Sequence, residues 1–316
     1  MLLLRDVRRT SHAYVTVYRL TGRYKPVIAR GYPVVKRTRF SEYKDSYEHY
    51  KFELSPEGIL FMQCHTNGGP LQWYWESHDR MADAFADVAG DREIKVVIHT
   101  GTGDTYNALW GKPVTESGAP LYNAYGDAEG VAYMDEKGWF GRMILENLLA
   151  IDVPLIAAVN GPCTMHSEVP LLMDIVLAAE EAYFQDLSHF PRGMVPGDGQ
   201  HVVWDALVGP ARARYLLWMG YALSAQEAKE WGVVHEVLPR EGLVDRAWEI
   251  ARELAKRPPI AIRNTKHVLT QSLKRAFLNE LDHGLQAEMW AQRQFFPFGA
   301  GMQGLDRPWD QKPWSD

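Results

Sequence analysis

The amino-acid sequence predicts an α/β fold in which units of strand, helix and strand follow one another and wind a largely parallel sheet, with a helical region after it. Two patterns predict this fold. Short apolar runs of strand length alternate with amphipathic stretches over residues 47–179. Beyond Phe184 the apolar residues recur mainly at helical spacing. With 316 residues, 46% of them hydrophobic, the chain is long enough to bury a substantial core.

The composition excludes several classes of protein. Against 34 Lys and Arg stand 40 Asp and Glu, so the formal charge of -6 creates no cationic field for nucleic acid or anionic lipid. No apolar stretch approaches the roughly 20 residues of a membrane span, and the apolar opening at residues 1–4 is shorter than a signal-peptide core. Two cysteines, Cys64 and Cys163, cannot form a disulfide framework. We expect a soluble cytoplasmic protein without nucleic-acid or membrane partners.

The first elements are an arm and a hairpin. Residues 1–45 carry a strand-like piece at 14–20 but no motif, and we interpret them as an N-terminal arm. Apolar and polar positions then alternate over residues 47–54 and 59–65. Pro56-Glu57-Gly58 lies between these two segments, and a proline- and glycine-containing turn between alternating runs predicts a β-hairpin.

A helix and a strand follow the hairpin. Ser77 is a suitable N-cap for a helix in which Met81, Phe85 and Val88 recur at helical spacing. Residues 94–99 are an apolar run of strand length. Strand, helix and strand in this order predict parallel pairing with a right-handed crossover.

The same order recurs further along the chain. A helix is predicted at 141–150, a strand at 155–159, a short helix at 166–173 and a strand at 175–178. Before them, residues 111–138 are rich in glycine and contain two prolines, which predicts an inserted surface loop or lid.

Helices dominate the C-terminal region, residues 223–316. Ser224 and Glu227 form a capping box, and Gly232 is placed to end the helix that they begin. Two long amphipathic helices complete the region, at 241–256 and 260–294, the second with a break near 282–284. The core between the arm and this region spans residues 46–222.

Several common cofactor motifs are incomplete. Gly101 and Gly103 begin a dinucleotide-binding fingerprint, but its third glycine would fall at Tyr106, and no P-loop lysine follows. A G-x-S-x-G nucleophile elbow is absent, as is a closely spaced set of zinc ligands. We therefore expect neither a nucleotide cofactor nor a metal.

Histidines are the most informative polar residues. His78, His166 and His189 lie at the boundaries of predicted elements rather than within apolar stripes. Asp198 follows His189 by nine residues, and the interval is rich in proline and glycine, so the chain can fold back and bring the carboxylate to the imidazole. A histidine oriented by an aspartate is a usual general base. The alternative from the residues alone is a surface histidine in a salt bridge.

Five segments together resemble the crotonase (enoyl-CoA hydratase/isomerase) superfamily. They are residues 95–103 (KVVIHTGTG), 153–162 (VPLIAAVNGP), 174–179 (DIVLAA), 195–199 (VPGDG) and 232–237 (GVVHEV). The resemblance implies a spiral of repeated ββα units followed by a C-terminal helical trimerisation region, and a homotrimer or hexamer. Two positions depart from the common pattern: His166 stands where most members have glycine, and His189 where hydratases often carry a catalytic glutamate.

These departures resemble one subgroup, the β-diketone hydrolases of the 6-oxocamphor hydrolase type. Six residues match its active-site positions: Trp73, His78, His166, His189, Asp198 and Glu288. The resemblance implies retro-Claisen cleavage of a carbon–carbon bond between two carbonyls, with neither coenzyme A nor metal. The expected substrate is a small, cyclic, apolar 1,3-diketone and the product is a keto acid.

The resemblance also implies roles for these residues. His189, held by Asp198, would deprotonate water, while His166 and the Trp73 indole would donate hydrogen bonds to the carbonyl oxygen where charge develops. His78 and Glu288 would form a second pair. Trp110 is expected beside the substrate.

Two alternatives stay open at this stage. One is a CoA-thioester enzyme of the same superfamily, a hydratase, hydrolase or decarboxylase, which would bind immobilised coenzyme A. The other is a catalytically silent scaffold. Trp73 and His166 also have structural interpretations. Trp73 can be an aromatic residue of the core, and His166 can be a buried histidine with satisfied hydrogen bonds.

Overall fold

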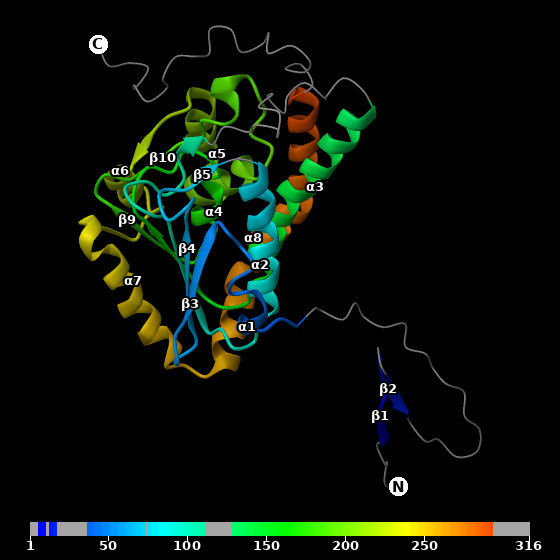
Figure 1. Ribbon diagram of the computed structural model, residues 1–316. Coiled ribbons are helices and arrows are strands. Elements are labelled where there is room, and N and C mark those ends of the chain that lie inside the picture. Colours follow the sequence, from blue (N-terminus) through cyan, green and yellow to red (C-terminus); the bar gives the residue numbers. More distant parts are fainter. Residues whose placement is uncertain (1–5, 11–12, 18–36, 74, 111–127, 293–316) are drawn as a thin grey trace. The chain divides into compact units, whose positions relative to one another are not determined.

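The computed structural model describes residues 6–10, 13–17, 37–73, 75–110 and 128–292 (Figure 1). The chain divides into two units, Met1–Arg37 and Thr38–Asp316. The first contains β1 (Asp6–Thr10) and β2 (Ala13–Val17), which pair antiparallel. The second contains every other described element, beginning with the short helix α1 (Phe40–Tyr43).

A six-stranded sheet forms the centre of the second unit, in the order β12-β9-β8-β6-β4-β3. Its strands are β3 (Tyr50–Leu54), β4 (Ile59–Cys64), β6 (Val96–Thr100), β8 (Leu155–Val159), β9 (Ile175–Ala179) and β12 (Glu236–Leu238). β3 and β4 pair antiparallel, which confirms the predicted hairpin. The other neighbours pair parallel. Every residue of β6 and β8 is buried, because helices cover both faces of the sheet.

Two groups of helices cover this sheet. α7 (Arg240–Ala255) packs against β6, β8 and β9. α2 (Trp75–Gly90), α3 (Ala128–Ala150) and α8 (Pro259–Gln292) form the other group, in which α3 packs against both α2 and α8. Figure 1 shows α7 on one side of the strands and the other group on the opposite side. The predicted α/β class with a C-terminal helical region is thus confirmed.

Shorter elements connect the layers. They are α4 (Glu168–Leu171), η2 (Phe190–Arg192), α5 (Gln200–Met219) and α6 (Ala225–Glu230), with the small strand pairs β5 (Gln72–Trp73) with β7 (Leu109–Trp110) and β10 (Tyr183–Phe184) with β11 (Leu223–Ser224). The Ser224–Glu227 capping box is present, and Gly232, with a φ of 78°, follows the end of α6 as predicted. None of the helices among the described residues is both long and apolar enough to span a membrane.

Three sequence predictions were wrong in part. α2 begins at Trp75, so Ser77 lies inside the helix and is not its N-cap. The insertion at 111–138 ends in helix, because α3 begins at Ala128, whereas residues 111–127 lie outside the described residues. α8 runs without a break through residues 282–284. Gly284 does not end this helix but lies against Gly197, so closely that a Cβ atom on either glycine would overlap the backbone of the other. The glycine is therefore needed for helix packing rather than for helix termination.

Candidate active site

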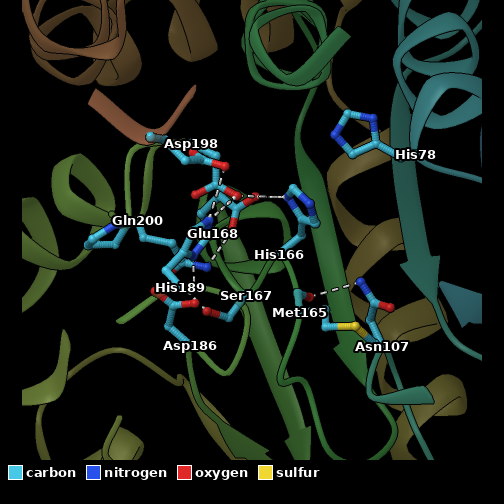
Figure 2. Close-up of polar contacts among 12 residues, drawn as sticks. His78, Asn107, Met165, His166, Ser167, Glu168, Asp186, His189, Asp198 and Gln200 are labelled. Carbon is cyan, nitrogen blue, oxygen red and sulfur yellow. Dashed lines mark hydrogen bonds and ion pairs between the residues drawn. The ribbon is translucent and has the colours of Figure 1, made fainter. Parts of the chain in front are cut away.

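A cluster of buried imidazoles and carboxylates lies between α4, η2, α5 and the last third of α8. Figure 2 shows His189, Asp186, Asp198 and Glu168 gathered beside His166, with His78 projecting toward this group from α2. Glu288, on α8, completes the cluster from the C-terminal side. The sequence-predicted residues His166, His189, Asp198 and Glu288 are thus brought together.

His189 is at the centre of three carboxylates. It precedes η2, and only 2% of its surface is exposed. Its Nδ1 lies 2.7 Å from Oδ1 of Asp186. Its Nε2 lies 3.4 Å from Oδ2 of Asp198 and 3.6 Å from Oε1 of Glu288. The imidazole therefore has one carboxylate on its Nδ1 side and two on its Nε2 side.

The predicted role of Asp198 as the residue that orients His189 requires correction. Asp198 does approach the imidazole, but at Nε2, whereas Asp186 makes the hydrogen bond to Nδ1. The sequence analysis did not identify Asp186, because the turn-rich interval that brings a carboxylate back to the imidazole follows His189, whereas Asp186 precedes it. A carboxylate three residues before His189, in the irregular segment after β10, was the signal that pointed to it.

His166 lies in the turn between β8 and α4. Its Nδ1 is 2.6 Å from Oε1 of Glu168 and 3.4 Å from Oδ2 of Asp198, so Asp198 lies between the two histidines. Among the described residues, Nε2 of His166 has no hydrogen-bonding partner, and 12% of the side chain is exposed. Glu168, fully buried behind the imidazole, is a second carboxylate that the sequence analysis did not identify.

The backbone of His166 adopts a left-handed conformation, with a φ of 47°. This region favours glycine and costs other L-residues about 1 kcal/mol or more. Asn107 holds the turn in place: its backbone oxygen accepts from the N–H groups of Thr164 and Met165, and its Nδ2 donates to the oxygen of Met165 at 2.8 Å. A residue with a strained backbone at the edge of a polar cluster points to function.

Trp73 and His78 pack beside His166. The ring centroid of Trp73 is 4.6 Å from that of His166, and the centroid of His78 is 5.3 Å away. Nδ1 of His78 lies 3.1 Å from Oδ1 of Asp79. The pairing of His78 with Glu288 stays a prediction. Trp110 is placed through its backbone, since β5 and β7 pair Trp73 with Trp110 in register.

Burial and neighbouring charges shift the pKa values in this cluster in opposite directions. Burial alone lowers the pKa of His189, but Asp186, Asp198 and Glu288 outweigh it, and the pKa is raised well above that of an ordinary histidine. Burial lowers the pKa of His166. Burial also raises the pKa of Asp198 to about 8, with Glu168 and Glu288 adding to the rise and His189 opposing it. The pKa values of the two histidines are therefore shifted in opposite directions.

Some of these side chains also have the chemistry of metal ligands. His166, Glu168 and Asp198 form one group, and His189, Asp198 and Glu288 another; the ligand atoms of each group lie within 4.8 Å of one another. Each imidazole also pairs with a carboxylate through its Nδ1, His166 with Glu168 and His189 with Asp186.

Comparisons with known proteins agree with the fold. The family model described as enoyl-CoA hydratase/isomerase matches residues 75–303. A β-diketone hydrolase from the cyanobacterium Anabaena sp. PCC 7120, solved bound to (S)-3-oxocyclohexyl acetic acid, is 42% identical, with a TM-score of 0.74 over 80% of this chain and 98% of that one. An enoyl-CoA hydratase/isomerase from Mycobacterium paratuberculosis is 26% identical, with a TM-score of 0.69 over 78% and 94% of the two chains.

A curated relative is similar in sequence as well. The carnitinyl-CoA dehydratase of Salmonella enteritidis is 34% identical over 190 residues, which are 60% of this chain and 68% of that protein. The family-model match covers most of the chain, including the whole polar cluster except Trp73. The chain therefore belongs to the enoyl-CoA hydratase/isomerase family, the crotonase superfamily.

Proposed function

We propose that this protein hydrolyses a carbon–carbon bond of a 1,3-diketone and releases a keto acid. The observation that carries the proposal is the placement of two histidines on either side of Asp198. One is surrounded by carboxylates, and the other lies at the edge of the cluster with an Nε2 that no described residue hydrogen-bonds. The similar β-diketone hydrolase supports it, since its ligand carries a ketone and a carboxylic acid on one carbon skeleton. That is the product pattern expected when a bicyclic diketone is cut between its carbonyls.

The chemistry has three requirements. A 1,3-diketone that cannot enolise between its carbonyls needs a nucleophile at one carbonyl carbon, a donor for the oxyanion that forms there, and an acceptor for the electrons of the breaking bond. The second carbonyl is that acceptor, because it becomes an enolate. Water supplies OH to the first carbonyl carbon and H to the carbon between the carbonyls, so the step needs no oxidant or reductant.

His189 is the proposed base. Asp186 orients the ring through Nδ1, which directs Nε2 toward Asp198 and the centre of the cluster. His189 and Asp198 titrate as a pair that shares a proton. When this pair has released one proton, His189 can take a proton from water as the water attacks the carbonyl carbon. Base catalysis of this kind typically contributes about 10²–10⁴-fold. The carboxylates then stabilise the imidazolium, which returns its proton to the enolate.

His166 and Trp73 are the proposed oxyanion donors. The exposed edge of His166 and the indole of Trp73 lie together, with ring centroids 4.6 Å apart. An N–H directed at the developing oxyanion typically contributes about 3–4 kcal/mol to transition-state stabilisation. Trp110, beside Trp73 in the β5–β7 pair, is proposed to contact the substrate. A neutral, apolar diketone suits a cluster whose charged side chains are mainly carboxylates.

The direct test is a screen of cyclic 1,3-diketones with the purified protein. Loss of the diketone ultraviolet absorbance and release of one equivalent of acid are followed together, with His189→Ala as the control. We expect His189→Ala to lower kcat by about 10²–10⁴-fold with a small change in KM. Acid release that continues unchanged in His189→Ala would contradict the proposal.

A second candidate function follows from the carnitinyl-CoA dehydratases, which share 34% identity with this chain. In that case the protein acts on a CoA thioester, as a hydratase, hydrolase or decarboxylase. An acyl-CoA that raises the melting temperature, or retention on immobilised coenzyme A, favours this candidate. The diketone hydrolase is expected to show neither.

We also propose that the protein assembles as a homotrimer or hexamer in the cytoplasm. Large hydrophobic side chains on α8 support the assembly: Val268, Leu269 and Leu278 are 71–79% exposed in the single chain. Sedimentation equilibrium measures the number of subunits, and a monomer at micromolar concentration would contradict this assembly.

A further inference from the structure

Glu168 is the least exposed member of the cluster, and it contacts His166 on the side opposite the open edge of the imidazole. The residue has 0% of its surface exposed. Its Oε1 lies 2.6 Å from Nδ1 of His166, and its Oε2 accepts from Nε2 of Gln200, also at 2.6 Å. Both carboxyl oxygens are thus hydrogen-bonded. The contact between Glu168 and His166 requires one proton, which lies either on Oε1 of Glu168 or on Nδ1 of His166.

The contacts of Gln200 determine the role of the other carboxyl oxygen, Oε2 of Glu168. Its Oε1 accepts from the indole N–H of Trp204 at 3.0 Å and from the hydroxyl of Ser167 at 3.1 Å. An indole nitrogen can only donate, so the oxygen of Gln200 faces Trp204 and its NH₂ group faces Glu168. Oε2 of Glu168 is therefore an acceptor, and a proton on this carboxyl group resides on Oε1, next to His166.

The surroundings favour a protonated Glu168. The titratable groups around its carboxyl are His166, His189, Asp186, Asp198, Glu288 and the thiol of Cys163. Burial raises the pKa of Glu168 well above its ordinary value; His189 opposes the rise, whereas Asp186 and Glu288 add to it. An ionised Glu168 would add a negative charge to a buried cluster that already contains Asp186 and Glu288, which is unfavourable in a low dielectric.

We propose that Glu168 is a positioning residue that, as a neutral carboxylic acid, donates a hydrogen bond from Oε1 to Nδ1 of His166 and thereby makes the Nε2–H of His166 the donor to the substrate oxyanion. This inference rests on the proposed function, in which His166 stabilises that oxyanion. The opposite proton position has a clear consequence. An ionised Glu168 accepts the Nδ1 proton, and Nε2 then presents a lone pair that repels an oxyanion.

The tautomer of His166 in the wild-type protein tests the proposal without any substrate. Nitrogen-15 NMR of histidine-labelled full-length protein distinguishes a protonated from an unprotonated ring nitrogen, and comparison with His166→Gln identifies the signals. At neutral pH we expect protonated Nε2 and unprotonated Nδ1. An Nδ1–H tautomer at neutral pH overturns the proposal.

Two substitutions test the contribution to catalysis. In Glu168→Gln the carbonyl oxygen can accept from Gln200 while the NH₂ group donates to His166, so the tautomer is kept at every pH. We expect kcat within about tenfold of wild type and loss of the decline at high pH that ionisation of Glu168 causes. Glu168→Leu lacks the donor, and we expect kcat to fall by about 10²–10³-fold with KM nearly unchanged.

A matched control separates this role from loss of a carboxylate in general. Glu236 is ion-paired with Arg246 at the edge of the sheet, and Glu236→Gln is expected to alter neither the tautomer nor kcat. If Glu168→Gln and Glu168→Leu lower kcat equally, the positioning role is wrong. If no diketone is cleaved but the NMR shows Nε2–H, the proposed function fails while the proton position holds; the reverse result refutes only the inference about Glu168.

Discussion

The turn that carries His189 and the turn that carries His166 place the same side chain in two different electrostatic environments. At His189, carboxylates face both ring nitrogens, and the pKa is raised. At His166, one nitrogen faces a buried acid, the ring lies against Trp73, and the pKa is lowered. The same type of side chain therefore has a raised pKa in one turn and a lowered pKa in the other, which suits the proposed roles of proton carrier and neutral hydrogen-bond donor.

The largest expected effect concerns the orientation of His189. Asp186→Asn replaces the acceptor at Nδ1 with an amide that can donate, which favours the tautomer whose Nε2 already carries a proton. A substitution of this kind costs up to about 10⁴-fold in kcat. The pKa of His189 should fall as well, because one of the carboxylates that stabilise the imidazolium is lost, so the rise of activity with pH moves to lower pH. A pH profile of kcat measures both changes, and unchanged turnover contradicts the role of Asp186.

His166→Gly tests the other turn. It removes one oxyanion donor, so we expect kcat to fall by about 10²–10³-fold. Folding stability is expected to stay level or to increase, since glycine adopts the φ of 47° without strain. Asn67→Gly is the control, because Asn67 has a φ of 51° and lies outside the cluster. Thermal unfolding and kcat are measured on both variants, and a strongly destabilised His166→Gly variant would show that the imidazole supports the fold.

Asp198 lies between the two turns, and its substitution should affect stability in a pH-dependent way. Its pKa is raised from 3.8 to about 8 in the folded protein, so the folded state holds this proton more tightly. Stability from this group is fully present below the lower value and is lost as pH rises through the higher one. Asp198→Asn has no such loss. At pH 8 we expect its melting temperature to exceed that of wild type by about 2–4 °C, with a smaller difference at pH 5. A difference that shrinks with rising pH contradicts this reasoning.

The smallest expected effect is that of metal removal. If hydrogen bonds, and not a bound metal ion, hold His166, Asp198 and His189 together, dialysis against a chelator leaves kcat and the melting temperature unchanged. Added zinc is then expected only to inhibit, by occupying one of the two groups that share Asp198. Activity that disappears on chelation and returns with one equivalent of metal would refute the metal-free mechanism.

The sequence predicted the sheet well, because its strands are continuous apolar runs bounded by turns and their burial on both faces leaves little ambiguity. Most of the candidate cluster was also predicted, through His166, His189, Asp198 and Glu288. Asp186 and Glu168 were missed. Asp186 lies three residues before His189 in irregular backbone, and Glu168 begins the short helix α4 two residues after His166. At such short spacings the sequence does not say which way a side chain points. The continuity of α8 was missed for a related reason, since a glycine that breaks a helix and a glycine that lets two backbones touch look identical in sequence.

The contact between Gly197 and Gly284 has a consequence for when the cluster becomes complete. Glu288 lies one turn after Gly284 on α8. The contact of Gly284 with Gly197 fixes the position of α8 along its axis, and therefore the position of Glu288 beside His189. A slip of one residue along that helix would turn Glu288 by about 100° and shift it by about 1.5 Å. During synthesis on the ribosome the polar cluster is therefore complete only after α8 has been made and has packed with Gly284 against Gly197.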